Sequence, residues 1–152
     1  MSDRMNTEKL GDLVTALVEA GKRAGADAAD AVVMQSRSSS VSVRLGKVES
    51  TDSSENDAVA LRVFVGRRVA SVSASSGADI AALAERAVAM AKASPEDPFQ
   101  GLADPAELTA EFPDLDLLDA TEPESEQLRA DALAAQEAAL AELPPELVTP
   151  LT

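Results

Sequence analysis

The chain lacks histidine and cysteine altogether across its 152 residues. Without histidine it can form neither a Ser-His or Cys-His catalytic pair nor a histidine-based zinc site. Without cysteine it can form neither disulfides nor thiolate metal sites, which is compatible with a reducing cytoplasm. No glycine-rich phosphate loop is present either. We therefore expect no catalytic, cofactor-binding or metal-binding residue in this chain.

Aromatic residues and long apolar runs are also scarce. There is no Trp or Tyr and there are three Phe, so the core must be built from Val, Leu and Ala, which bury less area per side chain. No apolar run approaches membrane-spanning length, and no basic segment followed by an apolar one opens the chain. These absences predict a soluble, cytoplasmic protein of a length that suits one domain.

Basic residues are missing from the last third of the chain. The 12 acidic and 12 basic side chains of residues 1–94 cancel, whereas residues 95–152 hold 15 acidic side chains against Arg129 alone, and so carry the whole net charge of −14. Such a surface argues against a nucleic-acid partner. The break near Ser94-Pro95 predicts an α+β core over 1–94, followed over 95–152 by an acidic, proline-containing linker and an Ala-rich helix of the same domain.

The centre of the chain alternates apolar and polar residues, which is typical of half-buried strands. Residues 41–45 and 59–65 show this alternation, and Gly46 and Gly66 stand where tight turns need positive φ. A further strand is expected over 28–35. Together these segments predict an antiparallel meander of about five strands.

Three helices are expected around this meander. The first has an apolar stripe at helical spacing that ends before Gly25. The second spans 79–93 after a capping-box spacing at Ser76–Asp79, and the third follows a T-x-x-E box at Thr121–Glu124. The predicted order is α-β-β-β-β-β-α-coil-α, an α+β fold with helices packed on one sheet. The stripe of the first helix consists of Leu10, Leu13, Val14, Leu17 and Val18.

Several polar groups have two interpretations. Arg62, Arg67 and Arg68 could form a small anion site around the Gly66 turn, but arginines at turns and sheet edges also keep a sheet soluble, and we favour that interpretation. The serines of 36–42 could supply a nucleophile beside Lys47, but serines alternating on a solvent-facing strand explain the run more simply.

The stretch Asp114–Asp119 resembles half of a calcium-binding loop. It lacks an oxygen ligand at the fifth position, a glycine at the sixth and a glutamate at the twelfth, which is Ser125. We interpret it as a solvated acidic linker.

An open sheet edge offers one further use for the polar residues of the meander. Such an edge can accept an extended peptide as an extra strand, although a helix or another subunit can equally cover it. The residues that would form this candidate peptide- or partner-binding face are Ser40, Ser42, Arg44, Arg62, Arg67 and Arg68.

The order of segments in the chain resembles the TldD/PmbA family. The resemblance rests on the order and spacing of several segments rather than on one diagnostic motif, and it covers nearly the whole chain. Two of the segments, 101–105 and 114–117, fit the PmbA (TldE) branch better than the TldD branch. The others are residues 24–30, 40–50, 61–68 and 87–98.

The resemblance implies a subunit of a zinc metalloprotease assembled from TldD-like and PmbA-like chains, once described as a modulator of DNA gyrase. In that family the TldD-like chain binds zinc through a His-Glu-x-x-x-His helix, and nothing here matches that motif. No catalytic residue is therefore carried over, and zinc is implied only on a TldD-like partner. Family members continue into a larger C-terminal domain, so this chain is expected to be an isolated N-terminal domain or a truncated product.

Two functions follow as expectations. The first is a non-catalytic N-terminal domain of a PmbA/TldE-like subunit, which acts as a scaffold or positions an extended peptide beside a TldD-like partner. The alternative is a stand-alone acidic module that binds other proteins or itself and has no link to proteolysis. Neither involves a nucleic acid or a membrane.

Overall fold

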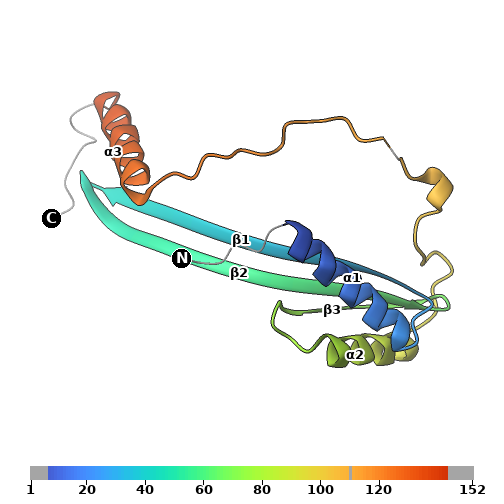
Figure 1. The fold of residues 1–152 in the computed structure, drawn as a ribbon. Helices are drawn as coiled ribbons and strands as arrows, with labels where there is room; N and C mark the ends of the chain where they lie inside the picture. Colours follow the sequence, from blue (N-terminus) through green and yellow to red (C-terminus); the bar gives the residue numbers. More distant parts are fainter. Residues whose placement is uncertain (1–6, 110, 144–152) are drawn as a thin grey trace. The chain divides into compact units, whose positions relative to one another are not determined.

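A computed structural model describes residues 7–109 and 111–143. These residues form an α+β fold, as the sequence predicts, with three α-helices and one antiparallel sheet (Figure 1). The elements in chain order are α1 (Thr7–Arg23), β1 (Ala28–Arg44), β2 (Lys47–Val65), β3 (Arg68–Ser75), α2 (Ile80–Ala93), the 3₁₀ turn η1 (Pro105–Glu107) and α3 (Ser125–Ala141).

The prediction of five strands is wrong, because the sheet has three strands in the order β1-β2-β3. The strands expected over 28–35 and 41–45 are one strand, β1, which continues through the serine run of 36–42, and β2 likewise continues through the polar stretch of 50–57. A hairpin exposed on both faces shows no apolar alternation, because its strands are joined by backbone bonds and side-chain pairs and neither face is buried.

Two glycine turns end the strands, as predicted. Leu45 and Gly46 both have positive φ, 49° and 73°, which is the requirement of the type I′ turn that suits the twist of a two-residue hairpin. Gly66, with φ 59°, turns β2 into β3. From that turn the register runs from Val65 opposite Arg68 to Ala58 opposite Ser75.

The chain divides into two compact units. Unit 1 comprises the described part of Met1–Ser36 together with Asn56–Phe112, and unit 2 comprises Arg37–Glu55 together with the described part of Pro113–Thr152. Both long strands contribute to both units, so each unit is considered separately below.

Unit 1 contains the hydrophobic core, which lies between one face of the sheet and the helices α1 and α2. Leu17 of α1 and Leu61 and Val63 of β2 are fully buried. Gly21 lets α1 approach the sheet closely, since a Cβ at this position would lie 3.3 Å from Ala29 Cβ and Val63 Cγ1. Within the described residues no polar or charged side chain is buried.

The helix α2 has a side-chain cap, although not from the residue that the spacing indicated. The predicted capping box has Ser76 as the N-cap and Asp79 as its acidic residue. In the structure Asp79 is itself the N-cap, and its side chain accepts hydrogen bonds from the N–H groups of Ala81 (2.9 Å) and Ala82 (3.3 Å). The helix ends at Ala93, before Ser94-Pro95, as predicted.

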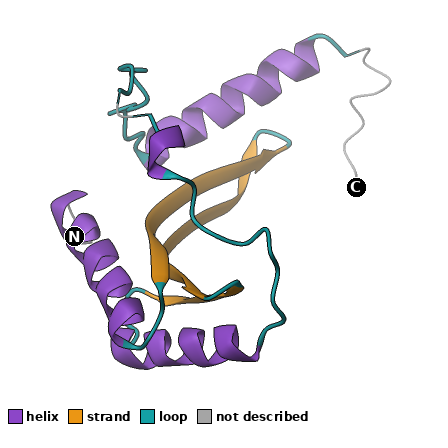
Figure 2. Cartoon of the chain, turned by 90° about the vertical axis from the view of Figure 1, so that its right-hand side faces the viewer, coloured by secondary structure: helices purple, strands orange, loops and turns teal. Residues whose placement is uncertain are grey.

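Unit 2 consists of the outer hairpin (residues 37–55), the segment 113–124 and α3. None of the α3 residues is buried. The predicted T-x-x-E box does not cap this helix: Glu124 is the N-cap and makes no side-chain bond. Thr121 instead donates its N–H to Asp119 Oδ1 (2.8 Å), which places it in a separate turn. The chain between α2 and α3 is drawn almost entirely as loop (Figure 2).

Candidate functional site

Asp27, the residue before β1, is hydrogen-bonded to the β2–β3 turn of unit 1. Its carboxylate oxygen Oδ2 accepts a hydrogen bond from Gly66 N–H (2.7 Å), and its own N–H donates to the carbonyl of Phe64 (2.9 Å). Gly66 needs this arrangement because a left-handed turn leaves its N–H without a partner in the strand pairing. Asp27 therefore holds the turn that presents Arg67 and Arg68.

Arg68 binds the end of α2. Its Nη1 donates to the carbonyl of Lys92 (2.8 Å), and its Nη2 lies 3.3 Å from the carboxylate of Glu96. The first bond satisfies a carbonyl that the helix end leaves without an intrahelical partner. Arg68 thus anchors α2 to the sheet.

Arg67 holds the segment that follows α2. Its guanidinium donates to the carbonyl of Pro98, and its own carbonyl accepts the N–H of Asp97 (2.9 Å). Asp97 in turn accepts hydrogen bonds from Phe99 N–H (3.0 Å) and from the Gln100 side chain (3.2 Å). The backbone bond first, and the Gln100 bond second, lower the pKa of Asp97 from its ordinary 3.8, because both favour the charged carboxylate.

Arg62 lies on the face of the sheet opposite the helices, since it stands between Leu61 and Val63, which face the core. Its Nε donates to both carboxylate oxygens of Asp30 (3.0 Å each), and its guanidinium lies 5.3 Å from the centroid of the Phe64 ring. The hydrogen bond to Asp30, and then its charge, raise the pKa of Arg62. The pair is exposed, so it contributes little to stability.

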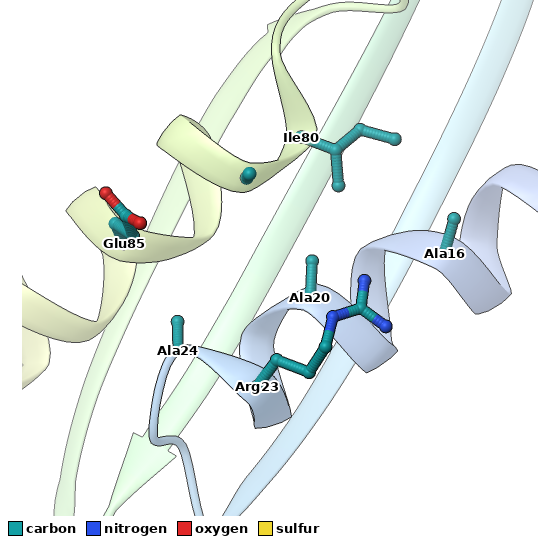
Figure 3. Close-up of a pocket in the computed structure, with 7 residues that line it drawn as sticks. Ala16, Ala20, Arg23, Ala24, Ile80 and Glu85 are labelled. Atoms are coloured by element: carbon teal, nitrogen blue, oxygen red, sulfur yellow. The ribbon is translucent and has the colours of Figure 1, made fainter.

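A groove of about 330 Å³ lies between α1 and α2. Small side chains make room for it: Ala16 and Ala20 of α1, and Ala24 directly after the helix, recur every fourth residue. Arg23 reaches along the groove from the end of α1 (Figure 3). The alanines of such a groove leave room for an apolar side chain, with Arg23 and Glu85 as its charged lining residues. The remaining lining residues are Ile80, Ala81 and Glu85.

In unit 2 the serine run lies on β1. Ser40, Ser42 and Arg44 share one parity of the strand and are all exposed. Arg44 lies 3.4 Å from the Glu49 carboxylate across the hairpin. They therefore form one continuous polar strip on one face of the hairpin.

The tip of the same hairpin touches α3. Gly46 N–H donates to the Gln136 side-chain oxygen (2.6 Å). A shallow groove of about 370 Å³ lies beside this bond, lined by Gly46, Gln136, Leu133, Glu137 and Leu140.

The six predicted face residues thus fall into separate groups. Ser40, Ser42 and Arg44 belong to unit 2, and Arg62, Arg67 and Arg68 belong to unit 1. Within unit 1, Arg62 points away from the helices, whereas Arg68 has the strand parity of the core residues. The three unit 1 arginines make intramolecular bonds, Arg62 to Asp30, Arg67 to Pro98, and Arg68 to Lys92 and Glu96.

Sequence reasoning missed the turn-fastening role of Asp27 and the groove between the helices. The spacing of Ala16, Ala20 and Ala24 signals the groove, since alanines every fourth residue leave one helix face flat. The bond from Asp27 to Gly66 joins residues that are distant in the sequence, and no local pattern indicates it.

The residues that the structure describes contain no group of three or more acidic side chains placed to hold a metal ion. No helix over 7–109 or 111–143 is long and apolar enough to cross a membrane.

Comparisons with known proteins agree with this fold. Residues 29–91 match the family PmbA/TldA metallopeptidase domain 1. Over 135 residues the chain is 33% identical to the metalloprotease PmbA homolog of Haemophilus influenzae, a match that covers 88% of this chain and 30% of that protein. The crystal structure of TldE from Thermococcus kodakarensis has the same fold, with a TM-score of 0.55 and 20% identity over 72% of this chain and 25% of that one.

The chain therefore spans less than a third of the length of either relative. The family match covers β2, β3, nearly all of α2 and most of β1, which are the elements that build the sheet and its core. The chain belongs to the PmbA/TldD family and carries the first domain of that family.

Proposed function

We propose that this chain is a non-catalytic platform of a PmbA/TldE-like subunit, which works in the cytoplasm beside a TldD-like subunit that carries the zinc. The observation that carries the proposal is a match to domain 1 of a metallopeptidase family in a chain with no histidine. A domain without zinc ligands can serve proteolysis by holding a partner or a substrate, but not by hydrolysing the peptide bond itself.

The hairpin of unit 2 is the part of the platform that would position a peptide. Ser40, Ser42 and Arg44 offer hydroxyl groups and a guanidinium along one strand face, and no apolar side chain interrupts them. Extended peptides are recognised by such strands through main-chain bonds, while side chains of alternate residues give specificity.

The test mixes the chain with a TldD-like subunit and follows both co-elution in size-exclusion chromatography and cleavage of an unstructured peptide. We expect co-elution and faster cleavage than with the TldD-like subunit alone. Ser42→Glu/Arg44→Glu should reduce the acceleration. The matched control Ser71→Glu/Ser73→Glu, at exposed positions of β3, should not. Absence of both co-elution and acceleration would contradict the platform role.

A second candidate is an acidic module that docks onto other proteins, and one feature of the linker favours it. Leu115, Leu117 and Leu118 are exposed, by 63%, 86% and 83%, and stand between aspartates in a segment without regular structure. Exposed leucines flanked by acidic residues suit an apolar groove with a basic rim on a partner.

The two candidates are separated by replacing these three leucines with serine. Under the docking role the variant loses partners that are captured by the wild type and identified by mass spectrometry as unrelated to TldD. Under the platform role the variant binds the TldD-like subunit as the wild type does. Unchanged capture of every partner would contradict the docking role.

A further inference from the structure

The segment 113–121 of unit 2 makes no hydrogen bond to any helix or strand that the structure describes. Its hydrogen bonds are local: Asp114 accepts the N–H of Asp116 (3.0 Å), and Asp119 accepts the N–H of Thr121 (2.8 Å). The segment has no regular structure, and all of its residues are exposed. It can therefore become fully extended without breaking a contact of the sheet or of the core.

Three exposed leucines stand in this segment. Leu115 is 63% exposed, Leu117 is 86% exposed and Leu118 is 83% exposed. Endopeptidases cut where a chain is open to them, and loops are their preferred sites. In one large class of these enzymes the specificity pocket is a hydrophobic slot, which suits a leucine side chain. The segment thus offers both an accessible backbone and the side chain that such a pocket accepts.

Exposure alone would select a different residue. Phe99 of unit 1 is 93% exposed, but the backbone around it is held in place. Its N–H donates to Asp97 Oδ1 (3.0 Å), and the N–H of Asp97 donates to the carbonyl of Arg67 (2.9 Å). The guanidinium of Arg67 in turn binds the carbonyl of Pro98. These bonds must open before Phe99 can be cut, whereas none has to open at the leucines.

We propose that residues 115–118 are a processing site, at which a separate endopeptidase with an apolar specificity pocket hydrolyses the bond between Leu117 and Leu118. Water supplies the atoms: its oxygen joins the carbonyl carbon of Leu117, which becomes a carboxylate. Its two hydrogens end on the nitrogen of Leu118, which becomes an ammonium group. No other co-reactant is needed.

The cut releases α3. None of the α3 residues is buried, and Gln136 accepts the N–H of Gly46 at the tip of the hairpin (2.6 Å). The intact chain maintains this contact because it keeps α3 at a high effective concentration beside the hairpin, and cleavage removes that advantage. Residues 118–152 hold eight acidic side chains against Arg129, so their release removes half of the net charge of −14.

This inference concerns a modification of the chain and does not depend on the proposed role in proteolysis. The product that remains keeps the whole hydrophobic core, which lies in unit 1. It also keeps the hairpin, whose Gly46 turn is freed of α3.

The test treats the full chain with a small amount of chymotrypsin and, separately, of subtilisin, and identifies the first products by mass spectrometry. We expect the first cut within 113–121 with both enzymes, and after Leu117 with chymotrypsin. The cut after Leu117 should be at least about tenfold faster than the cut after Phe99. Size-exclusion chromatography should then separate the two fragments, and the larger fragment should unfold at the same temperature as the intact chain.

Two variants separate the side chains from the backbone. Leu115→Ser/Leu117→Ser/Leu118→Ser should slow the first chymotrypsin cut by about tenfold or more. The matched control Leu102→Ser/Leu108→Ser, at exposed positions of unit 1, should leave that rate unchanged. Circular dichroism of each variant shows that the fold is kept.

Arg67→Ala tests the reason why Phe99 is protected. This change removes the bond to the carbonyl of Pro98, and it should accelerate the cut after Phe99 while leaving the cut after Leu117 unchanged. An unchanged rate at Phe99 would contradict the protection by backbone bonds on which the choice of site depends.

Three further results would overturn the proposal. The first is an initial cut outside 113–121 with either enzyme. The second is a folded serine variant that chymotrypsin cuts in this segment as fast as the wild type. The third is a cut chain whose fragments stay together, or whose larger fragment unfolds.

Discussion

The helices α2 and α3 show how differently the two units are held together. Both are rich in alanine and of similar length, but α2 buries Leu83, Ala84, Ala87, Val88 and Ala91, whereas α3 buries no residue. Burial of apolar area contributes roughly 25 cal/mol per Å². Most of the stability of this protein therefore comes from unit 1.

The outer hairpin differs from the inner one in the same way. Where β1 and β2 pass beneath the helices, alternate residues are buried or partly buried, and beyond Ser36 and before Asn56 most are exposed. The same two strands thus change from a packed sheet to a ribbon held by backbone bonds and by pairs such as Arg37–Glu55 (2.7 Å). An isolated ribbon of two strands is only marginally stable, so unit 2 is expected to open more readily than unit 1.

The largest effect is expected from one chemical change made in both units. Leu17→Ala removes a fully buried side chain of α1 and should lower the free energy of unfolding by about 2–5 kcal/mol. Leu133→Ala in α3 removes a partly exposed one and should lower it by less than about 1 kcal/mol. Urea unfolding followed by circular dichroism measures both. Equal losses would contradict the contrast between the units.

Two glycines of α1 allow a second comparison. Gly21→Leu forces a side chain against Ala29 and Val63, and should destabilise the protein by about 1–3 kcal/mol. A Cβ added at Gly11 would meet no atom within 4 Å, so Gly11→Ala should stabilise the protein by about 0.5–1 kcal/mol through helix propensity. Thermal unfolding distinguishes the two. A neutral Gly21→Leu would show that α1 does not pack closely on the sheet.

The helix caps give a smaller effect. Asp79→Ala removes the side chain that accepts two N–H groups of α2, and should cost about 1 kcal/mol. Glu124→Ala at the corresponding position of α3 removes no cap bond, and should change the unfolding free energy by less than about 0.5 kcal/mol. The measurement compares the urea concentrations at the midpoint of unfolding, in variants whose dependence of unfolding free energy on urea is unchanged. A comparable loss in both variants would mean that α3 is capped as firmly as α2.

The smallest effect concerns two exposed aspartates, one in each unit. The pKa of Asp97 is lowered by the bond from Phe99 N–H and then by Gln100, and the pKa of Asp119 is lowered by its bonds to Thr121. Because both pKa values are depressed on folding, these turns are favoured above the ordinary value of 3.8 and weaken as the pH falls through the lowered values. NMR titration of the two carboxyl carbons should give midpoints below 3.8. A midpoint at the ordinary value for either would show that its turn is not formed in solution.

Much of unit 1 could be predicted because its signals are local. The apolar stripe of α1, the Ser94-Pro95 stop after α2 and the glycine turn at 66 each act over a few residues, and the structure contains all three, as it does the Gly46 turn of unit 2. The number of strands could not be predicted in this way. Polar runs such as 50–57 look like breaks, but a long two-stranded ribbon tolerates them because its pairing uses the backbone.

The candidate site shows the same limit. The sequence indicates that Ser40, Ser42 and Arg44 share a strand face, since side-chain alternation is local. It does not indicate that Arg67 binds Pro98 or that Arg68 binds Lys92 and Glu96. Those partners lie 24 or more residues away in the chain.

By itself the sequence determined the α+β class and the family that the chain resembles. Both depend on residue types and on local sequence patterns, which are the same in the unfolded and the folded chain. The tertiary structure decided which polar residues are bonded, where the chain divides into units and how many strands the described sheet has. Those features arise from contacts between segments that are distant in the sequence. Such contacts contribute to stability only once the sheet and its helices have assembled.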